Sequence, residues 1–373
     1  MKPYETEQAK VVLLLSHTAL TQTPDTESAD VICPTTNWEA VARLAARQGV
    51  LAIAWDGLML LHEQGIIDKS LLPQRDIRLK WALSVEGAEK RYARQRAVIE
   101  KLAEMYQKEG ITMTILKGYG LSLCYPTPPH RTSSDIDIWL AGEQQRADDI
   151  LRTKYRIEIS EDVHHHTVFY IDGVMIENHY DFINVHAHTS SRKIEQELKQ
   201  AASQGGDIIS VGNATIQLPN ANLHALFLLR HAAAHFAGAE IVLRHIFDWA
   251  MFVRTHHQRI DWQWLYGICS EHKMERFAYA MNGLAIRLCG IGSELFGSFE
   301  RHNDIEIRIL NDTLEPEFSL PRPKRGLLRI VWFKTRRWWA NRWKRKLVYS
   351  EGQLHSFVTQ AWSHLLKPKG IKH

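Results

Sequence analysis

The chain has 373 residues, of which 45% are hydrophobic and 24% charged, so it is long enough to bury a sizeable core and has an ordinary globular composition. Its four cysteines are scattered without a Cys-x-x-Cys pair, which argues against a zinc ribbon or a disulfide scaffold and is typical of a reducing compartment. Because no apolar run is long enough for a signal peptide or a membrane span, we expect a cytoplasmic protein.

Hydrophobic periodicity predicts an α+β chain in four parts: a helical subdomain over residues 1–109, a core over 110–218, a second helical subdomain over 219–315 and a basic tail over 316–373. The expected helices are residues 7–19, a segment after the Thr36-x-x-Glu39 capping box, 75–109, 120–125, 143–154, 193–203 and most of 220–310. The expected strands are residues 112–116, 136–140, 156–159, 167–171, 174–179 and 214–218. Residues 205–207 and 316–325 are expected linkers.

A glycine turn is expected after the first strand, in the run Lys117-Gly118-Tyr119. Backbone amides at such a turn can approach a phosphate, and Lys117 could neutralise it as a point charge, although an ordinary exposed lysine is the competing interpretation. Arg131 follows a proline-rich segment and is a candidate fork for a phosphate. Ser133 could contact the phosphate or cap the turn.

Two aspartates stand on one face of the next predicted strand, in the sequence Asp135-Ile136-Asp137-Ile138. Side chains alternate along a strand, so both carboxylates point the same way while the isoleucines point into a core. Two like charges this close are costly to bury unless a cation compensates them, and hard oxygen ligands suit Mg²⁺ or Mn²⁺. We therefore predict that Asp135 and Asp137 bind a divalent metal.

A third carboxylate lies on a predicted hairpin. Asp172-Gly173 is a strong two-residue turn signal, and the strand that follows places Glu177 and His179 on one face. If the hairpin joins the same sheet, Glu177 faces the same metals, and His179 either orients a carboxylate or simply packs. The preceding run His164–His166 is expected to be a loop. Three carboxylates around a metal pair indicate phosphoryl or nucleotidyl transfer.

The second helical subdomain carries further candidates. His231 and His235 are one turn apart on one predicted helix, and Arg244 and Asp248 are one turn apart on the next. Such a layer could close over a nucleotide, with His235 or Arg244 on the phosphates and Asp248 orienting one of them. The alternative is two packed helices with an internal Arg244–Asp248 ion pair.

The ordered series Lys117-Gly118, Arg131, Asp135-x-Asp137 and Glu177-x-His179 resembles that of the bacterial nucleotidyltransferase-like proteins of the NTP_transf_5 type, a branch of the DNA-polymerase-β-like nucleotidyltransferase superfamily. The similarity extends from about residue 8 to about residue 255. It implies a polymerase-β-like core, a small mixed sheet with helices, flanked by helical N- and C-terminal subdomains. It implies Mg²⁺ or Mn²⁺ as cofactor and an NTP as substrate. The implied catalytic metal ligands are Asp135, Asp137 and Glu177, and the implied nucleotide-binding residues are Lys117, Gly118, Arg131, Ser133, His235, Arg244 and Asp248.

The chain departs from the wider superfamily at the turn, where many members have Gly-Ser or Gly-Gly. Lys117-Gly118-Tyr119 stands there, so the serine that usually reaches a phosphate is missing. Lys117, Arg131 or Ser133 could replace it.

The tail is strongly basic. Residues 318–373 hold fourteen Lys and Arg and one acidic residue, a net charge of +13, which leaves −9 for the rest of a chain whose total is +4. Tryptophans are interleaved with the cations over residues 322–347, so this segment could bind nucleic acid, an anionic membrane surface or another acidic polymer. The alternative is a terminal helix that docks its tryptophans on an acidic body and leaves its arginines solvated.

The predicted activity is that of a metal-dependent nucleotidyltransferase of the EC 2.7.7 type, which moves a nucleoside monophosphate from an NTP to an unidentified acceptor and releases pyrophosphate. The acceptor could be a small molecule, a peptide, a protein or an RNA. Two alternatives stay open. One is a catalytically inactive protein that binds through its tail, and the other is a metal-dependent phosphohydrolase that uses His231, His235 and Asp248.

Overall fold

The computed structural model describes residues 2–350 apart from residues 25, 27, 162–164, 186–188, 239, 322, 324 and 325. Within this part of the chain seven strands form one mixed sheet, in the order β3-β4-β5-β2-β1-β7-β6. The strands are β1 (Thr114–Ile115), β2 (Asp135–Trp139), β3 (Ile159–Glu161), β4 (His166–Ile171), β5 (Val174–His179), β6 (Gly206–Val211) and β7 (Ala214–Pro219). The α+β class predicted from the sequence is confirmed.

Helices precede, interrupt and follow the sheet. Those before it are α1 (Glu7–Thr21), α2 (Trp38–Arg47), α3 (Leu51–Glu63) and α4 (Arg75–Gln107). Those between its strands are α5 (Tyr119–Ser122), α6 (Gln144–Thr153) and α7 (Thr189–Ala202). Those after it are α8 (Ala221–Gly238), α9 (Leu243–His256), α10 (Trp262–Glu271), α11 (Glu275–Cys289), α12 (Asn303–Leu314), α13 (Leu327–Ala340) and α14 (Arg342–Val348). None of the described helices is both long and apolar enough to span a bilayer.

The centre of the sheet pairs β2 with β5 in parallel, although the two strands are separated by α6, β3 and β4 in the chain. The register sets Asp137 opposite Glu177 and Trp139 opposite His179. Because paired residues of neighbouring strands project to the same face of a sheet, the acidic and imidazole side chains of the two strands lie on one face.

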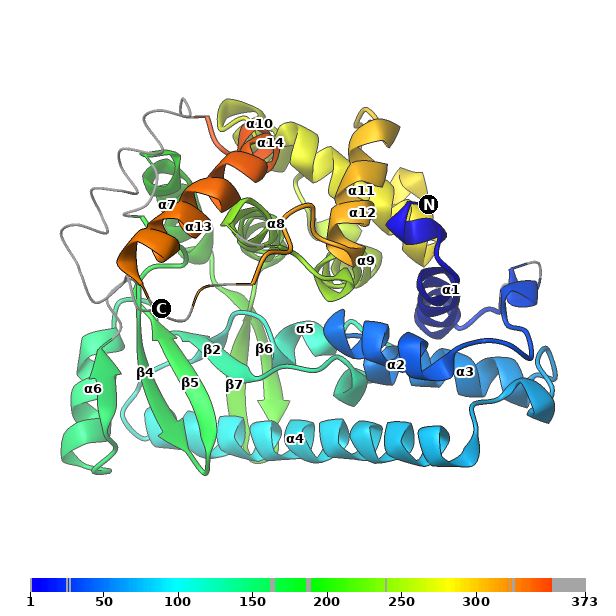
Figure 1. The fold of residues 1–373 in the computed structure, drawn as a ribbon. Coiled ribbons are helices and arrows are strands. Elements are labelled where there is room, and N and C mark those ends of the chain that lie inside the picture. Colours follow the sequence, from blue (N-terminus) through cyan, green and yellow to red (C-terminus); the bar gives the residue numbers. More distant parts are fainter. Residues whose placement is uncertain are drawn as a thin grey trace.

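The other face of the sheet is apolar and packs on α4 and α6. Ile136 and Ile138 of β2 and Ile176 of β5 belong to one buried cluster with Ile99 of α4 and Leu151 of α6. Figure 1 shows α4 as a single long helix that runs along this side of the sheet and continues to α2 and α3. The polar face of the sheet is turned toward the layer of helices that contains α8 and α9 (Figure 1).

A second, larger core joins the N-terminal helices to the C-terminal ones. It includes Leu15 of α1, Trp81 of α4, Phe227 of α8 and Trp249 of α9. Trp139 connects this core to the sheet, because its ring stacks on that of Phe182 with a centroid separation of 4.2 Å. Trp139 thus joins the polar face of the sheet to the larger core.

Two local predictions are wrong. The helix α2 begins at Trp38 with Asn37 as its N-cap, whose side chain accepts a hydrogen bond from the amide of Ala40 at 3.0 Å, so Thr36 is not the cap. The expected linker at residues 205–207 contains the start of β6, which pairs with β7. Gly206 is required there because a Cβ would lie 1.9 Å from the carbonyl oxygen of Leu218. The glycine pair that was predicted to form a linker instead marks a close approach between two strands.

Candidate active site

The carboxylates of β2 and β5 meet as the alternation and the hairpin predicted. Asp137 is fully buried, and its Oδ1 lies 3.1 Å from Lys117 Nζ and 3.1 Å from His179 Nε2. His179 Nε2 also lies 3.5 Å from Glu177 Oε2. The ligand atoms of Asp137, Glu177 and His179 all lie within 4.8 Å of one another. Asp135 precedes Asp137 by two residues and shares its face of β2.

Electrostatics at this group show an excess of negative charge. Burial, and then repulsion from Asp137, raise the pKa of Asp135. Burial alone would raise the pKa of Asp137 too, but Lys117 and His179 hold it below its ordinary value. Burial would lower the pKa of His179, yet its hydrogen bonds to Asp137 and Glu177 raise it to about 9. Lys117 and a protonated His179 thus face three carboxyl groups.

The donors fit a hard divalent cation. Oδ2 of Asp137 is buried and has no hydrogen-bond partner among the described residues, which is costly for a carboxylate unless a ligand completes it. Carboxylate oxygens from Asp135, Asp137 and Glu177 are the type of ligand that Mg²⁺ and Mn²⁺ take. The residues present therefore suit such an ion.

The glycine turn lies directly against the aspartate strand. The amide of Leu116 donates to the carbonyl oxygen of Asp137 at 3.0 Å, and Gly118 follows with a positive φ of 60°. A Cβ at Gly118 would lie 3.3 Å from Ser133 Oγ. That hydroxyl donates to the backbone and side-chain oxygens of Asp135 at 3.1 and 3.2 Å. Lys117 and Ser133 therefore both contact the carboxylates, one on Asp137 and the other on Asp135.

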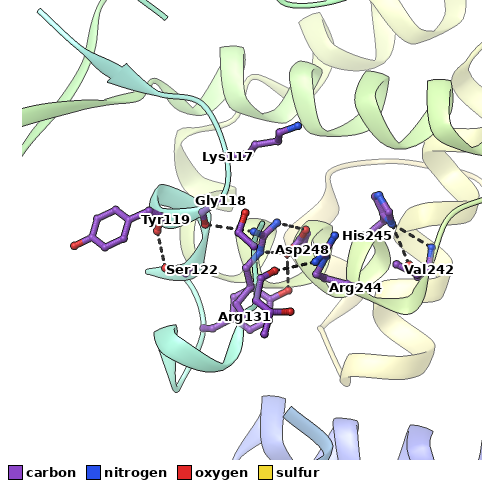
Figure 2. A network of polar contacts seen from close by, with 12 residues as sticks. Lys117, Gly118, Tyr119, Ser122, Arg131, Val242, Arg244, His245 and Asp248 are labelled. Carbon is purple, nitrogen blue, oxygen red and sulfur yellow. Dashed lines mark hydrogen bonds and ion pairs between the residues drawn. The ribbon is translucent and has the colours of Figure 1, made fainter. Parts of the chain in front are cut away.

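Arg131 and Asp248 are paired with each other. Arg131 Nε lies 2.9 Å from Asp248 Oδ1 and its terminal nitrogen lies 2.7 Å from Oδ2, while the hydroxyl of Tyr125 donates to Oδ1 at 2.7 Å. Arg131 also reaches the carbonyl oxygen of Gly118 at 3.5 Å. Figure 2 shows this network between the turn at Gly118 and helix α9. Asp248 pairs with Arg131 rather than with Arg244, so the internal pair considered for α9 is absent.

Arg244 points into the same region from the start of α9. Its terminal nitrogen donates to the carbonyl oxygen of Thr132 at 2.8 Å (Figure 2). Its Nε is buried without a hydrogen-bond partner in the part of the chain described. A guanidinium with a free buried donor is suited to an anionic ligand.

A group of three histidines stands beside these cations, and we refer to His231, His235 and His245 as the histidine cluster. Their ring nitrogens lie within 4.8 Å of one another, with His231 and His235 on α8 and His245 on α9. Desolvation lowers the pKa of all three, although His235 is exposed at the edge of the cluster, and Lys117 lowers those of His231 and His235 further. The positive charges of Lys117 and Arg244 disfavour an added cation beside the cluster, and its neutral imidazoles can offer N–H donors to an anion.

The sequence-based reasoning missed His245 and Tyr125. His245 adjoins Arg244 in the chain, but only the packing of α9 on α8 brings it to the other two histidines. Tyr125 belongs to the proline-rich segment, whose residues Pro128–His130 form a short 3₁₀ turn. His130 of that turn contacts Asp56 at 2.7 Å and Glu89 at 3.1 Å, which fixes the segment on α3 and α4.

The histidine run before the hairpin is only partly a loop. His164 lies outside the described residues, whereas His166 is the first residue of β4 and pairs with His179 in register. His166 Nε2 lies 3.9 Å from Glu177 Oε1. Strand pairing therefore brings a histidine to Glu177 from a second direction.

Of the comparisons with known proteins, the family model agrees with these motifs. No curated protein matches the chain. Among solved structures, an antigenic nucleotidyltransferase-like protein from Paracoccidioides brasiliensis aligns with a TM-score of 0.34 and 12% identity, over 54% of this chain and 96% of that one. The model of the NTP_transf_5 family, described as uncharacterised nucleotidyltransferases, matches residues 34–290, and this chain belongs to that family.

Proposed function

We propose that the protein transfers a nucleoside monophosphate from an NTP to an acceptor hydroxyl or phosphate. The acceptor oxygen bonds to the α-phosphorus, the bond from that phosphorus to the oxygen bridging the β-phosphate breaks, and pyrophosphate leaves while the acceptor proton is lost to solvent. The observation that carries the proposal is the set of carboxylates on one sheet face, with Asp137 Oδ2 buried and lacking a hydrogen-bond partner among the described residues.

Asp135, Asp137 and Glu177 would bind Mg²⁺ or Mn²⁺, which when bound would neutralise phosphate charge and lower the proton affinity of the acceptor. His179 holds Asp137 through Oδ1 and leaves Oδ2 for the ion. Ser133 orients Asp135. Lys117 neutralises Asp137 in the absence of substrate, and its flexible stem would let the ammonium shift toward a phosphate.

The triphosphate would lie between the carboxylates and the α8–α9 layer. Arg244 supplies a buried unpaired donor, and His235 supplies an imidazole within the histidine cluster. The backbone at Gly118 can approach the nucleotide because a glycine with positive φ has no side chain in the way. Arg131 and Asp248 would position the turn at Gly118 rather than contact the nucleotide, because their ion pair holds that turn against α9.

The phosphohydrolase alternative is weaker in this geometry. It requires Asp248 next to His231 and His235, yet both carboxylate oxygens of Asp248 accept hydrogen bonds from Arg131, and Oδ1 accepts another from Tyr125. The third member of the histidine cluster is His245 instead. Such a cluster lacks the carboxylate that the hydrolase would use.

The test is to incubate the purified protein with each NTP, labelled on either the α- or the γ-phosphate, together with Mg²⁺ or Mn²⁺ and a cell extract. We expect α-label in an acceptor and γ-label in pyrophosphate. Asp137→Asn should lower the rate at least about 10²–10³-fold, as for loss of one preorganised electrostatic group.

Asp172→Asn is the matched control, because Asp172 lies in the exposed hairpin turn where asparagine tolerates its positive φ of 49°. It should keep full activity. Unchanged labelling by Asp135→Ala/Asp137→Ala would refute the proposal, and γ-label released as inorganic phosphate without pyrophosphate would replace it with hydrolysis.

A further inference from the structure

Helix α13 presents a row of alternating cations and indole rings. The residues follow one another at intervals of three or four, which places them along one side of a helix. We call this set the Arg–Trp row, and it consists of Arg329, Trp332, Arg336, Trp339 and Arg342, the last just beyond the end of α13. All five side chains are exposed, with Trp332 57% and Trp339 62% exposed. Figure 1 shows α13, in orange, on the outside of the helical layer.

Cations and rings in the row touch each other. The guanidinium of Arg336 lies 4.9 Å from the ring centroid of Trp332, and that of Arg342 lies 4.7 Å from the centroid of Trp339. Arg336 and Arg342 therefore each lie beside an exposed ring one helical turn away. A ligand that contacts the guanidinium of such a pair therefore also lies next to the indole ring.

The charge of the segment selects an anionic partner. Residues 318–350 contain eleven Lys and Arg and no Asp or Glu. A uniform positive charge of this kind attracts polyanions and repels basic surfaces.

The C-terminal part of the segment, helix α14, is packed against the rest of the protein. The ring of Trp343 packs edge-on against Phe236 of α8 with a centroid separation of 5.2 Å. Lys344 is buried and forms an ion pair with Asp312 of α12. The tail therefore docks Trp343 and Lys344 while it leaves Trp332 and Trp339 exposed, so it combines the docked helix and the exposed basic, aromatic surface considered from the sequence.

We propose that the Arg–Trp row binds single-stranded nucleic acid, with bases stacked on Trp332 and Trp339 and phosphates on the arginines. Every base has a face that can stack on an indole, and single strands leave those faces accessible. The two tryptophans are seven residues apart, about 10 Å along the helix axis, with Arg336 between them. The alternation of indole and guanidinium groups in the row matches the alternation of bases and phosphates in a single-stranded nucleic acid.

A membrane surface fits the row less well. Helices that lie in the interface gather apolar side chains on one face and cations on the opposite one. In α13 the cations and the rings share one row, so inserting Trp332 and Trp339 into lipid would draw Arg336 in with them. The geometry thus favours a partner that offers negative charges and aromatic rings side by side.

The experiment uses the full chain without NTP or divalent metal, so its outcome is independent of catalysis. Short fluorescent single-stranded RNA and DNA, the corresponding duplex, and phosphatidylserine–phosphatidylcholine vesicles are titrated in parallel. We expect tighter binding of single strands than of duplex or vesicles. Trp332→Ala/Trp339→Ala should weaken single-strand binding about 30-fold or more, as expected for the loss of two base-stacking contacts. Gln at the three arginines should reduce the slope of log affinity against log salt by about 2.

Matched controls lie elsewhere on the surface. Tyr170→Ala removes a 60% exposed ring from β4, and Gln at Lys90, Arg152 and Lys193 removes three exposed cations, so both variants should bind like the parent. Preferred binding to vesicles would overturn the proposal in favour of a membrane surface. Single-strand binding that survives loss of both tryptophans, or no binding at all, would also overturn it. The relative affinities for RNA and DNA show which strand is the ligand.

Discussion

At the scale of single residues, the Arg131–Asp248 pair is the contact that joins the candidate site to the helical layer. Both partners are buried, with exposed fractions of 6% each. Burial alone would raise the pKa of Asp248, but Arg131 lowers it. The pair holds the turn at Gly118 because Arg131 also contacts the carbonyl oxygen of that residue.

Removing one partner should be costly. Asp248→Ala leaves the Arg131 guanidinium buried without its counter-ion, so we expect a loss of about 3–5 kcal/mol in the free energy of unfolding, measured with urea. Asp149→Ala, in the exposed pair of Asp149 with Arg152, should cost less than about 1 kcal/mol. Equal effects of the two variants would contradict a structural role for the buried pair.

The same pair has a defined pH dependence. The pKa of Asp248 is lower in the folded state than its ordinary value of 3.8. Its contribution to stability is therefore complete above that value and is lost as the pH falls through the lower folded-state pKa. We expect acid unfolding curves of the parent and of Asp248→Ala to converge below pH 3.8, and a stability difference that stayed constant there would contradict this.

At the scale of elements, α1 and α3 approach each other unusually closely at Gly57. A Cβ added to this glycine would lie 1.9 Å from the carbonyl oxygen of Leu15. Leu15 is fully buried in the large core, so neither backbone has room to move apart without opening the packing around it.

Gly57→Ala should therefore destabilise the fold, by at least the 1–3 kcal/mol typical of overpacking. Gly267 of α10 is the matched control, because nothing lies within 4 Å of a Cβ built there. Gly267→Ala should be neutral or stabilise by up to about 1 kcal/mol through helix propensity. Thermal unfolding of both variants is the measurement, and a stable Gly57→Ala would show that the helices are not in this close contact.

At the scale of the whole molecule, the basic tail is joined to an acidic body by polar contacts as well as by apolar packing of Leu347 and Val348 in the large core. Lys344 pairs with Asp312, and both are 1% exposed. The guanidinium of Arg308 lies 3.9 Å from the ring centroid of Trp343. Both contacts join α14 to α12, since Trp343 and Lys344 belong to α14 and Arg308 and Asp312 belong to α12.

Lys344→Met should uncouple the tail from the body, because it leaves Asp312 buried and uncompensated. We expect a loss of about 3–5 kcal/mol in unfolding free energy, together with faster proteolysis within α13 and α14. Lys346→Met changes an exposed lysine of the same helix and should leave both readouts as in the parent. Similar proteolysis of the two variants would argue against docking through Lys344.

Several features were predictable because their signals are local. Alternation around Asp135 and Asp137 predicted the strand β2, although both of its faces are covered instead of one, and Asp172-Gly173 predicted the turn of the β4–β5 hairpin. The long helix α4 matched its expected span closely, since its periodicity persists over many turns. The N-cap of α2 and the whole strand β6 were missed, because one-residue shifts in capping and close strand approach leave little trace in composition.

The sequence by itself determined the chemistry available: three carboxylates, a glycine turn, and a tail of cations and tryptophans. Tertiary structure decided which of these groups meet. The parallel pairing of β2 with β5 set Asp137 opposite Glu177, and the packing of α9 gave Asp248 to Arg131 and His245 to the histidine cluster. The physical reason is that periodicity encodes the face on which a side chain lies, whereas partner and register depend on burial shared between segments far apart in the chain.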